Sequence, residues 1–362
     1  MPPHPHRPPE LAWQVFRGSE AIRRGLLSRH HLRGSSWIRL RQDVYADARL
    51  DRDHALACRA ALLRMPPGAA IAGPSAAYLH GVEHAADFTD DVHVLLPATV
   101  RADSQPGVRV HHAPMSSTRS GLLVPVGSAA PARTSSPVGT RSPAGTRSPT
   151  GTRSPAGTRS PAGTRSPAGS SPPAGTGSPG AVMILAGPPP RTEPAACAWE
   201  TAVWADPVEA VGIVDGLLRT GSVNRSALAS EAARNACRPG GRRAAWVFGL
   251  TDGLAQSPPE SHLRVRLVLA GLPRPVAQYP VRVPTGLILH PDLAWPEFRV
   301  AVEYDGQWHS EADRMHLDRR RLNQLVAAGW LVLHVTGRRL RKEFSALVRE
   351  IRAALVARGW RP

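Results

Sequence analysis

The chain has 362 residues, enough for two or three domains, and its 45 Lys and Arg outnumber its 28 Asp and Glu to give a formal net charge of +17. A charge of this size favours a polyanionic partner, most simply DNA, with RNA as the other nucleic acid that fits. Three widely spaced cysteines argue against a zinc site or a disulfide framework, and no apolar run approaches the ~18 residues of a membrane span, so we expect a cytoplasmic protein without a membrane partner.

The first residues suggest a tail followed by a small basic module. Residues 1–10 are rich in Pro and His and predict a disordered tail. Short helices are then expected over 19–25 and 28–33, followed by an alternating hairpin over 37–45. This order is typical of a winged helix-turn-helix, whose basic residues would face DNA phosphates. The basic residues concerned are Arg33, Arg39 and Arg41. A helical subdomain with a solvated basic face explains the pattern equally well.

Helix patterns over 54–65 and 73–79 and strand patterns over 91–97 and 107–112 extend this module into a small α/β unit. Together with the preceding motifs, residues 11–115 resemble the N-terminal region of bacterial proteins related to the AbiEi-type antitoxins. The residues that carry the resemblance are Phe16–Ala21, Gly25–Leu27, Leu32–Arg33, Val44–Ala46, Gly73–Ala77 and Leu79–Val82. The resemblance implies a DNA-binding or regulatory module, and it leaves a partner toxin unidentified.

Residues 116–190 are dominated by a Gly-Thr-Arg-Ser-Pro-Ala repeat. The repeat has no apolar position from which to build a core, and each unit contains a proline, so we expect a long disordered linker. Its arginines would touch nucleic acid only non-specifically, and an expanded DNA repeat tolerated in a loop explains its origin as well. Helical patterns return over 191–257, which we interpret as a helical bridge packed on the domain that follows.

The last part of the chain, residues 258–362, shows the order helix, three strands, helix, strand, helix. The strands are expected over 276–283, 287–293, 298–304 and 330–335, and the closing helix over 339–358. This order predicts an α/β domain in which a mixed sheet is flanked by helices.

Three acidic residues converge at the ends of the expected strands. The two-residue period of a strand puts Glu303 and Asp305 on one face, and a hairpin through Pro296 and Glu297 would bring Asp292 beside Glu303. Clustered carboxylates repel one another and are costly to bury, so they favour a bound Mg²⁺ or Mn²⁺. The alternative is that they are ordinary strand-end acids paired with the many nearby arginines.

With these acids in place, the domain resembles the PD-(D/E)XK nuclease superfamily, in particular the very-short-patch-repair-like endonuclease domains. The residues that carry the resemblance are Glu260–Arg264, Pro291–Asp292, Glu303–Gly306, His309, Asp318–Arg321 with Leu325, and Gly329–Trp330. The resemblance implies a restriction-endonuclease-like fold. One departure is that Asp305 stands at the usual lysine position, so the activating charge must come from elsewhere, with His309 the best candidate.

The resemblance implies a division of roles among these residues. Asp292 and Glu303 would hold the Mg²⁺, with Asp305 as a further ligand or as an acid behind the ligands. His309 would act as general base or stabilise developing charge. The remaining candidates are Glu260, which would complete the metal shell or orient a ligand, and Arg264 and Arg321, which would grip phosphate oxygens. Arg321 alternatively pairs with Asp318, one helical turn away.

Two functions are therefore expected. The first is a metal-dependent DNA endonuclease that serves DNA repair or defence against phages and mobile elements. The second is a catalytically silent, antitoxin-like regulator that binds DNA on a nuclease scaffold. Retained carboxylates favour the first, and the lost lysine position favours the second. The sequence does not decide whether the substrate is DNA or RNA, or whether cleavage cuts one strand or both. It also leaves the target and the oligomeric state open.

Overall fold

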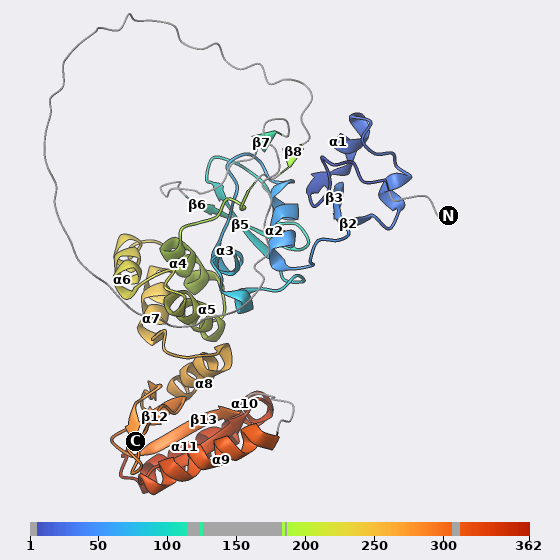
Figure 1. The fold of residues 1–362 in the computed structure, drawn as a ribbon. Coiled ribbons are helices and arrows are strands. Elements are labelled where there is room, and N and C mark those ends of the chain that lie inside the picture. The colour runs from blue at the N-terminus through green and yellow to red at the C-terminus, as the bar shows by residue number, and fades with distance from the viewer. Residues whose placement is uncertain (1–5, 114–123, 126–182, 185–186, 306–311) are drawn as a thin grey trace, which may run out of the picture.

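The computed structural model describes residues 6–113, 187–305 and 312–362, together with two short strands at 124–125 and 183–184. Within this part of the chain the protein is a mixed α/β structure (Figure 1). Most of the repeat region 116–190 lies outside the described residues, so the expected linker is not addressed by the structure. None of the described helices is long and apolar enough to cross a membrane.

The N-terminal unit contains the expected order of helical turns followed by a hairpin. Its elements are β1 (Val15–Arg17), α1 (Gly18–Arg23), the 3₁₀ turn η1 (His31–Arg33), β2 (Trp37–Arg41) and β3 (Val44–Asp47). The strands form an antiparallel sheet in the order β1-β3-β2. Phe16 and Trp37 meet edge to face in its core, with ring centroids 5.1 Å apart. Of the expected tail, residues 1–5 lie outside the described residues, whereas Nε2 of His6 contacts the carbonyl of Leu26 at 3.0 Å.

The second unit is a small α/β layer. Its elements are α2 (His54–Leu62), β4 (Ala70–Ile71), α3 (Gly73–Leu79), η2 (Glu83–Ala85), β5 (Val92–Pro97) and β6 (Val108–Ala113). β5 and β6 are parallel, whereas β4 runs antiparallel to β5. The chain rejoins this unit after the repeat region, since the Ile71 N–H donates to the Pro190 carbonyl (2.8 Å) and the Thr192 N–H to the Ile71 carbonyl (2.9 Å). The repeat region is therefore inserted within one folded unit.

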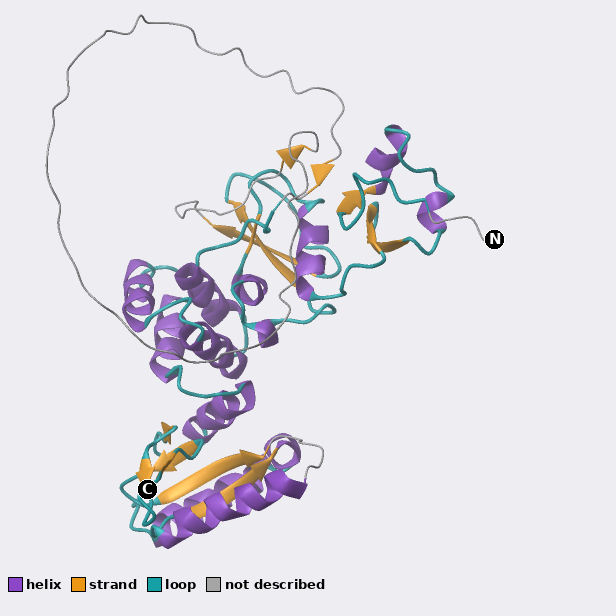
Figure 2. Ribbon diagram, viewed as in Figure 1, coloured by secondary structure: helices purple, strands orange, loops and turns teal. Residues whose placement is uncertain are grey.

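Four helices follow, and Figure 2 shows them between the N-terminal layer and the C-terminal domain. They are α4 (Pro194–Trp204), α5 (Pro207–Arg219), α6 (Arg225–Arg234) and α7 (Gly241–Leu250). The expected packing of these helices on the following domain is present, since residues of α4, α5 and α7 share a buried cluster with Val265 of α8, but it is only part of their packing. Cys197, Ile213 and Leu217 share one buried cluster with Ile71 and Val94 of the α/β layer. The helices thus complete the N-terminal core, and α5 also packs against α8.

The C-terminal domain has the expected mixed sheet. Its elements are α8 (Pro258–Leu269), β9 (Val276–Ala277), β10 (Val281–Arg282), β11 (Ile288–Leu289), β12 (Leu293–Trp295), β13 (Val300–Asp305), α9 (Ala312–Ala327), β14 (Leu331–Thr336), α10 (Gly337–Lys342) and α11 (Phe344–Ala357). The main sheet has the order β14-β13-β12-β9, in which only β13 and β14 are parallel.

Helices cover both faces of this sheet. Val300 and Val302 pack with buried residues of α8 and α11, whereas Ala301 packs with Leu325 of α9. The alternation along β13 therefore places Glu303 and Asp305 on the face that α9 covers.

Three expected elements of this domain are divided in the structure. The strand expected over 276–283 breaks at Gln278, whose φ of 52° is left-handed, and Pro280 then lacks a backbone donor. The strand expected over 287–293 is split between β11, which pairs with β10, and β12 in the main sheet. The closing helix is divided at Glu343 into α10 and α11.

Candidate functional site

The hairpin between β12 and β13 brings Asp292 next to Glu303. Leu293 pairs with Val302 in an antiparallel arrangement, so Asp292 and Glu303 occupy the next positions on the two strands, at the same end of the hairpin. The backbone N–H of Tyr304 donates to Oδ2 of Asp292 at 2.8 Å, which fixes this carboxylate against β13. The expected juxtaposition of these two acids is therefore present.

The surroundings of both carboxyl groups disfavour their ionised forms. Burial raises the pKa of Glu303 to about 7, and the charge of Asp292 acts in the same direction, while Arg321 opposes both. Burial likewise raises the pKa of Asp292. The Glu303 side chain is only 14% exposed, and its Oε1 is buried without a hydrogen-bond partner among the described residues. The site thus contains more negative charge than its surroundings compensate.

Glu260 reaches this site from the first turn of α8. Its Oε1 accepts from the Ser257 hydroxyl (2.7 Å), and its Oε2 accepts from the backbone N–H of Gln256 (2.8 Å). Burial and the nearby charge of Asp292 raise its pKa. The amide of Gln278 lies between the two acids, with Nε2 3.2 Å from Asp292 Oδ1 and 3.5 Å from Glu260 Oε2.

Sequence reasoning did not identify Gln278. The residue sits in what reads as an ordinary strand, and its neighbours in the site are 14 and 18 positions away. The only signal was a polar amide shortly before Pro280 in an otherwise apolar stretch.

Asp305 stands at the exposed end of β13, with 51% of its side chain accessible. Its carboxylate contacts Nδ1 of His334, on β14, at 3.1 Å. In the described part of the chain, no group of three or more His, Cys, Asp or Glu side chains has the spacing of a metal site. His309 and the side chain of Asp318 lie outside the described residues, so their expected roles are not addressed by the structure.

Arg321 projects from α9 towards the same acids. Its Nη2 lies 3.3 Å from Glu303 Oε1 and donates to the carbonyl of His290. The expected alternative, an acid paired with a nearby arginine, is therefore realised for Glu303. Arg321 therefore places a positive charge against the carboxylates from the helix that covers this face of the sheet.

The expectation that Arg264 grips a phosphate is wrong. Its side chain is 1% exposed and forms ion pairs with Asp215 (2.6 Å) and Asp252 (2.9 Å). It also donates to the carbonyl of Leu250. These contacts tie α8 to the preceding helices, and a side chain buried to this extent is not accessible to DNA. The partners are too distant in sequence for the pairing to have been predicted.

The three arginines expected to face DNA divide into two groups. Arg33 and Arg39 are exposed and line a hollow of about 640 Å³ on the N-terminal unit, together with Arg29. Arg41 corrects the expectation, because it donates to the carbonyls of Pro106 (3.0 Å) and Gly107 (2.8 Å). It joins β2 to the loop before β6, and burial lowers its pKa.

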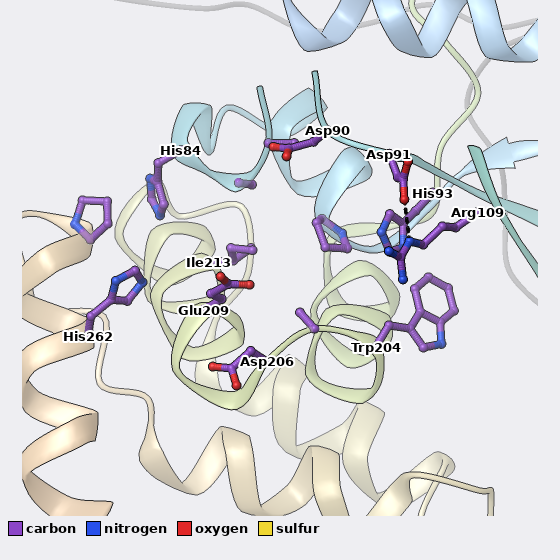
Figure 3. A pocket seen from close by; sticks show the side chains of 15 residues that line it. His84, Asp90, Asp91, His93, Arg109, Trp204, Asp206, Glu209, Ile213 and His262 are labelled. Carbon is purple, nitrogen blue, oxygen red and sulfur yellow. Dashed lines mark hydrogen bonds and ion pairs between the residues drawn. The ribbon is translucent and has the colours of Figure 1, made fainter. Parts of the chain in front are cut away.

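A second cavity, of about 500 Å³, lies between the α/β layer, α5 and the start of α8 (Figure 3). Its lining does not include Asp292, Glu303 or Glu260. His111 stacks on Trp204 with ring centroids 3.5 Å apart, and its Nε2 lies 3.1 Å from Nδ1 of His93. Burial lowers the pKa of both imidazoles to about 4, so they are neutral near pH 7. The stack is a packing contact between β5, β6 and α4.

Comparison with known proteins gives relatives but no family. No family model matches the chain, and no solved structure matches it. The chain is 32% identical over 161 residues to an uncharacterized protein of Mycobacterium tuberculosis strain H37Rv and, equally, to one of strain CDC 1551 / Oshkosh. Each match covers 44% of this chain and 59% of the relative, so the chain spans less than two thirds of the length of these relatives.

Proposed function

We propose that the protein is a metal-dependent DNA endonuclease that hydrolyses phosphodiester bonds at the end of β12 and β13, on a restriction-endonuclease-like fold. The observation that carries the proposal is the pair of Asp292 and Glu303. Two partly buried carboxylates stand side by side with raised pKa values, and one buried oxygen has no hydrogen bond from the residues that the structure describes. A fold gains no stability from such a pair by itself.

These residues fit a hard divalent cation. Mg²⁺ and Mn²⁺ take oxygen ligands, and Asp292 and Glu303 present carboxylate oxygens at one strand end. Among the described residues, Oε1 of Glu303 has an ion pair with Arg321 and no hydrogen-bond partner, so it is available as a metal ligand. When bound, Mg²⁺ supplies Lewis-acid polarisation of the scissile phosphate and makes water more acidic.

The chain's own groups would divide the remaining work. Asp292 and Glu303 hold the cation. Asp305, at the exposed end of β13, is a further ligand or an acid that contacts the ligands without binding the metal. His309 is the proposed general base. Arg321 supplies the positive charge beside the carboxylates that the strand itself lacks, so it orients Glu303 rather than gripping DNA.

The N-terminal unit supports DNA as the substrate. Arg29, Arg33 and Arg39 converge on one hollow beside the β2–β3 hairpin, as expected for a winged-helix-like surface that contacts phosphates. The formal net charge of +17 would strengthen this contact through counterion release. In this proposal the unit holds duplex DNA while the C-terminal domain cuts it.

One observation favours the second candidate, a silent DNA-binding regulator. The ion pair between Arg321 and Glu303 compensates part of the acid charge without any metal. Such a pair would allow the nuclease scaffold to persist after loss of catalysis.

The test is incubation of the purified full chain with supercoiled plasmid and, separately, with single-stranded RNA of the same sequence. Each substrate receives Mg²⁺, Mn²⁺ or EDTA. We expect nicked or linear plasmid with either metal and none with EDTA. Plasmid binding in a gel shift without cleavage in any metal would instead support the regulator, and cleavage of RNA alone would contradict DNA as the substrate.

A further inference from the structure

We infer that Gln278 is a positioning residue that fixes the Asp292 carboxylate for metal binding, and that Glu260 acts through Gln278 rather than as a metal ligand. The inference rests on the proposed function, since it assigns roles within the same site. It concerns three side chains that meet where β9, β12 and α8 converge.

The amide of Gln278 is oriented by its neighbours on both sides. Its Oε1 accepts from Nε2 of Gln256 at 3.2 Å, so the amide nitrogen is turned towards the acids. That nitrogen then donates to Asp292 Oδ1 (3.2 Å) and lies 3.5 Å from Glu260 Oε2. The reverse orientation would set the amide oxygen against two carboxylates, which is electrostatically unfavourable.

The backbone of Gln278 is held just as firmly. Its φ of 52° is left-handed, a conformation that is unfavourable for a residue other than glycine. Its N–H donates to the carbonyl of Asp292 (3.2 Å), and its own carbonyl accepts from the His290 imidazole (3.0 Å). One contact to the Asp292 backbone and one to the His290 side chain therefore accompany the contact between the Gln278 amide and the Asp292 carboxylate. The left-handed backbone of Gln278 directs its side-chain amide to the position between Asp292 and Glu260.

Glu260 has no carboxylate oxygen left unpaired. One oxygen accepts from the Ser257 hydroxyl, and the other from the Gln256 N–H and from the Gln278 amide. Asp292, in contrast, accepts one hydrogen bond on each oxygen, from Gln278 and from Tyr304. Each carboxylate oxygen has two acceptor sites, so among the described residues Glu260 has three of its four sites filled, whereas Asp292 has two filled and keeps one site on each oxygen for a cation. Of the two choices left open for Glu260, orienting a ligand is therefore the one that the contacts favour.

A neutral amide suits this position better than a cation would. Glu260 and Asp292 repel one another, and a donor is needed between them. A lysine or arginine would supply the donor but would also neutralise the charge that attracts Mg²⁺. The glutamine amide satisfies both acids and leaves their negative charge in place.

The test compares Gln278→Met and Gln278→Asn with wild type, with Gln324→Met on α9 as the matched control. Methionine keeps the length but removes the donor. Asparagine keeps the amide and suits a left-handed backbone, but it is one methylene too short to reach both acids. Mn²⁺ affinity is measured by titration calorimetry, folding by circular dichroism and thermal unfolding of the metal-free protein, and cleavage by plasmid nicking.

We expect both Gln278 variants to bind Mn²⁺ about 10- to 100-fold more weakly than wild type, with Gln278→Asn unfolding no earlier and Gln324→Met unchanged. Wild-type Mn²⁺ affinity in both Gln278 variants would overturn the inference while leaving the proposed function intact. Weakening by Gln278→Met alone, with Gln278→Asn normal, would assign the role to the backbone and also overturn it. Absence of Mn²⁺ binding and nicking in wild type would remove the proposed function, and the inference would fall with it.

Discussion

The backbone N–H of Tyr304 donates a 2.8 Å hydrogen bond to Oδ2 of Asp292. The carboxylate beside β12 is therefore fixed in place by the backbone of β13, the other strand of the hairpin. The contact depends on the register of β12 and β13, in which Leu293 faces Val302. A shift of the register by one residue would turn Asp292 to the opposite face and away from Glu303. The geometry of the acid pair is thus a property of the sheet.

Replacement of Arg264 by leucine should destabilise the protein without acting on DNA directly. The change leaves the buried Asp215 with its hydrogen bonds from Ser261 and two backbone N–H groups but without its cationic partner, and loss of one partner of a buried pair typically costs about 3–5 kcal/mol. Chemical denaturation followed by tryptophan fluorescence measures the loss. Arg349→Leu, at an exposed position of α11, is the matched control and should change the stability by about 0.5 kcal/mol or less. Equal stability of the two variants would contradict the buried role.

The buried Glu200 should make stability fall as the pH rises. Its Oε2 accepts from the Gly73 N–H (2.9 Å) and the Thr192 hydroxyl (2.8 Å), and burial raises its pKa from 4.5 to about 7. Between these values the native state keeps a proton that the unfolded chain has released. The free energy of unfolding therefore decreases through this window, by on the order of 3 kcal/mol at its upper end.

Glu200→Gln mimics the protonated acid and should flatten this pH dependence. The measurement is the denaturation midpoint at a series of pH values from 4.5 to 8, since the group's own transition lies within that range. Glu209→Gln, at an exposed position of α5, serves as the control and should keep the wild-type profile. A Glu200→Gln profile as steep as that of wild type would assign the pH dependence to other groups.

Arg33 and Arg39 should contribute phosphate contacts, whereas Arg41 should not. Each lost contact lowers the slope of log affinity against log salt concentration by about 0.9 on duplex DNA. We expect this change for Arg33→Ala and for Arg39→Ala, measured by fluorescence anisotropy at several salt concentrations. Arg41→Ala should leave the slope unchanged, because its guanidinium is bound to two carbonyls. A reduced slope for Arg41→Ala alone would reverse this assignment.

The sequence predicted the parts of the fold that depend on local pattern. The alternation from Phe298 to Tyr304 matches β13, and the Pro296–Glu297 turn matches the hairpin that brings the first two acids together. Both signals lie within about a dozen residues. β1 was not predicted, since its three residues, Val15–Arg17, are too few to show a period.

Contacts between distant segments could not be predicted in this way. Arg264 and Asp215 are 49 residues apart, and the sequence placed Arg264 on the DNA although it is buried. The strand expected around Gln278 was broken by a left-handed residue that no local pattern signals. The packing of α4 and α5 on the N-terminal α/β layer was missed, because apolar periodicity shows that a face is buried and not what covers it.

The most direct test of the proposed nuclease is the rate of plasmid nicking in Mg²⁺ by wild type, Asp292→Asn, Glu303→Gln and Glu297→Gln. Glu297 is an exposed acid in the turn of the same hairpin, so it controls for loss of a charge near the site. We predict that Asp292→Asn and Glu303→Gln each lose at least about 100-fold in rate while Glu297→Gln nicks as fast as wild type. Nicking that survives in both Asp292→Asn and Glu303→Gln would contradict the account.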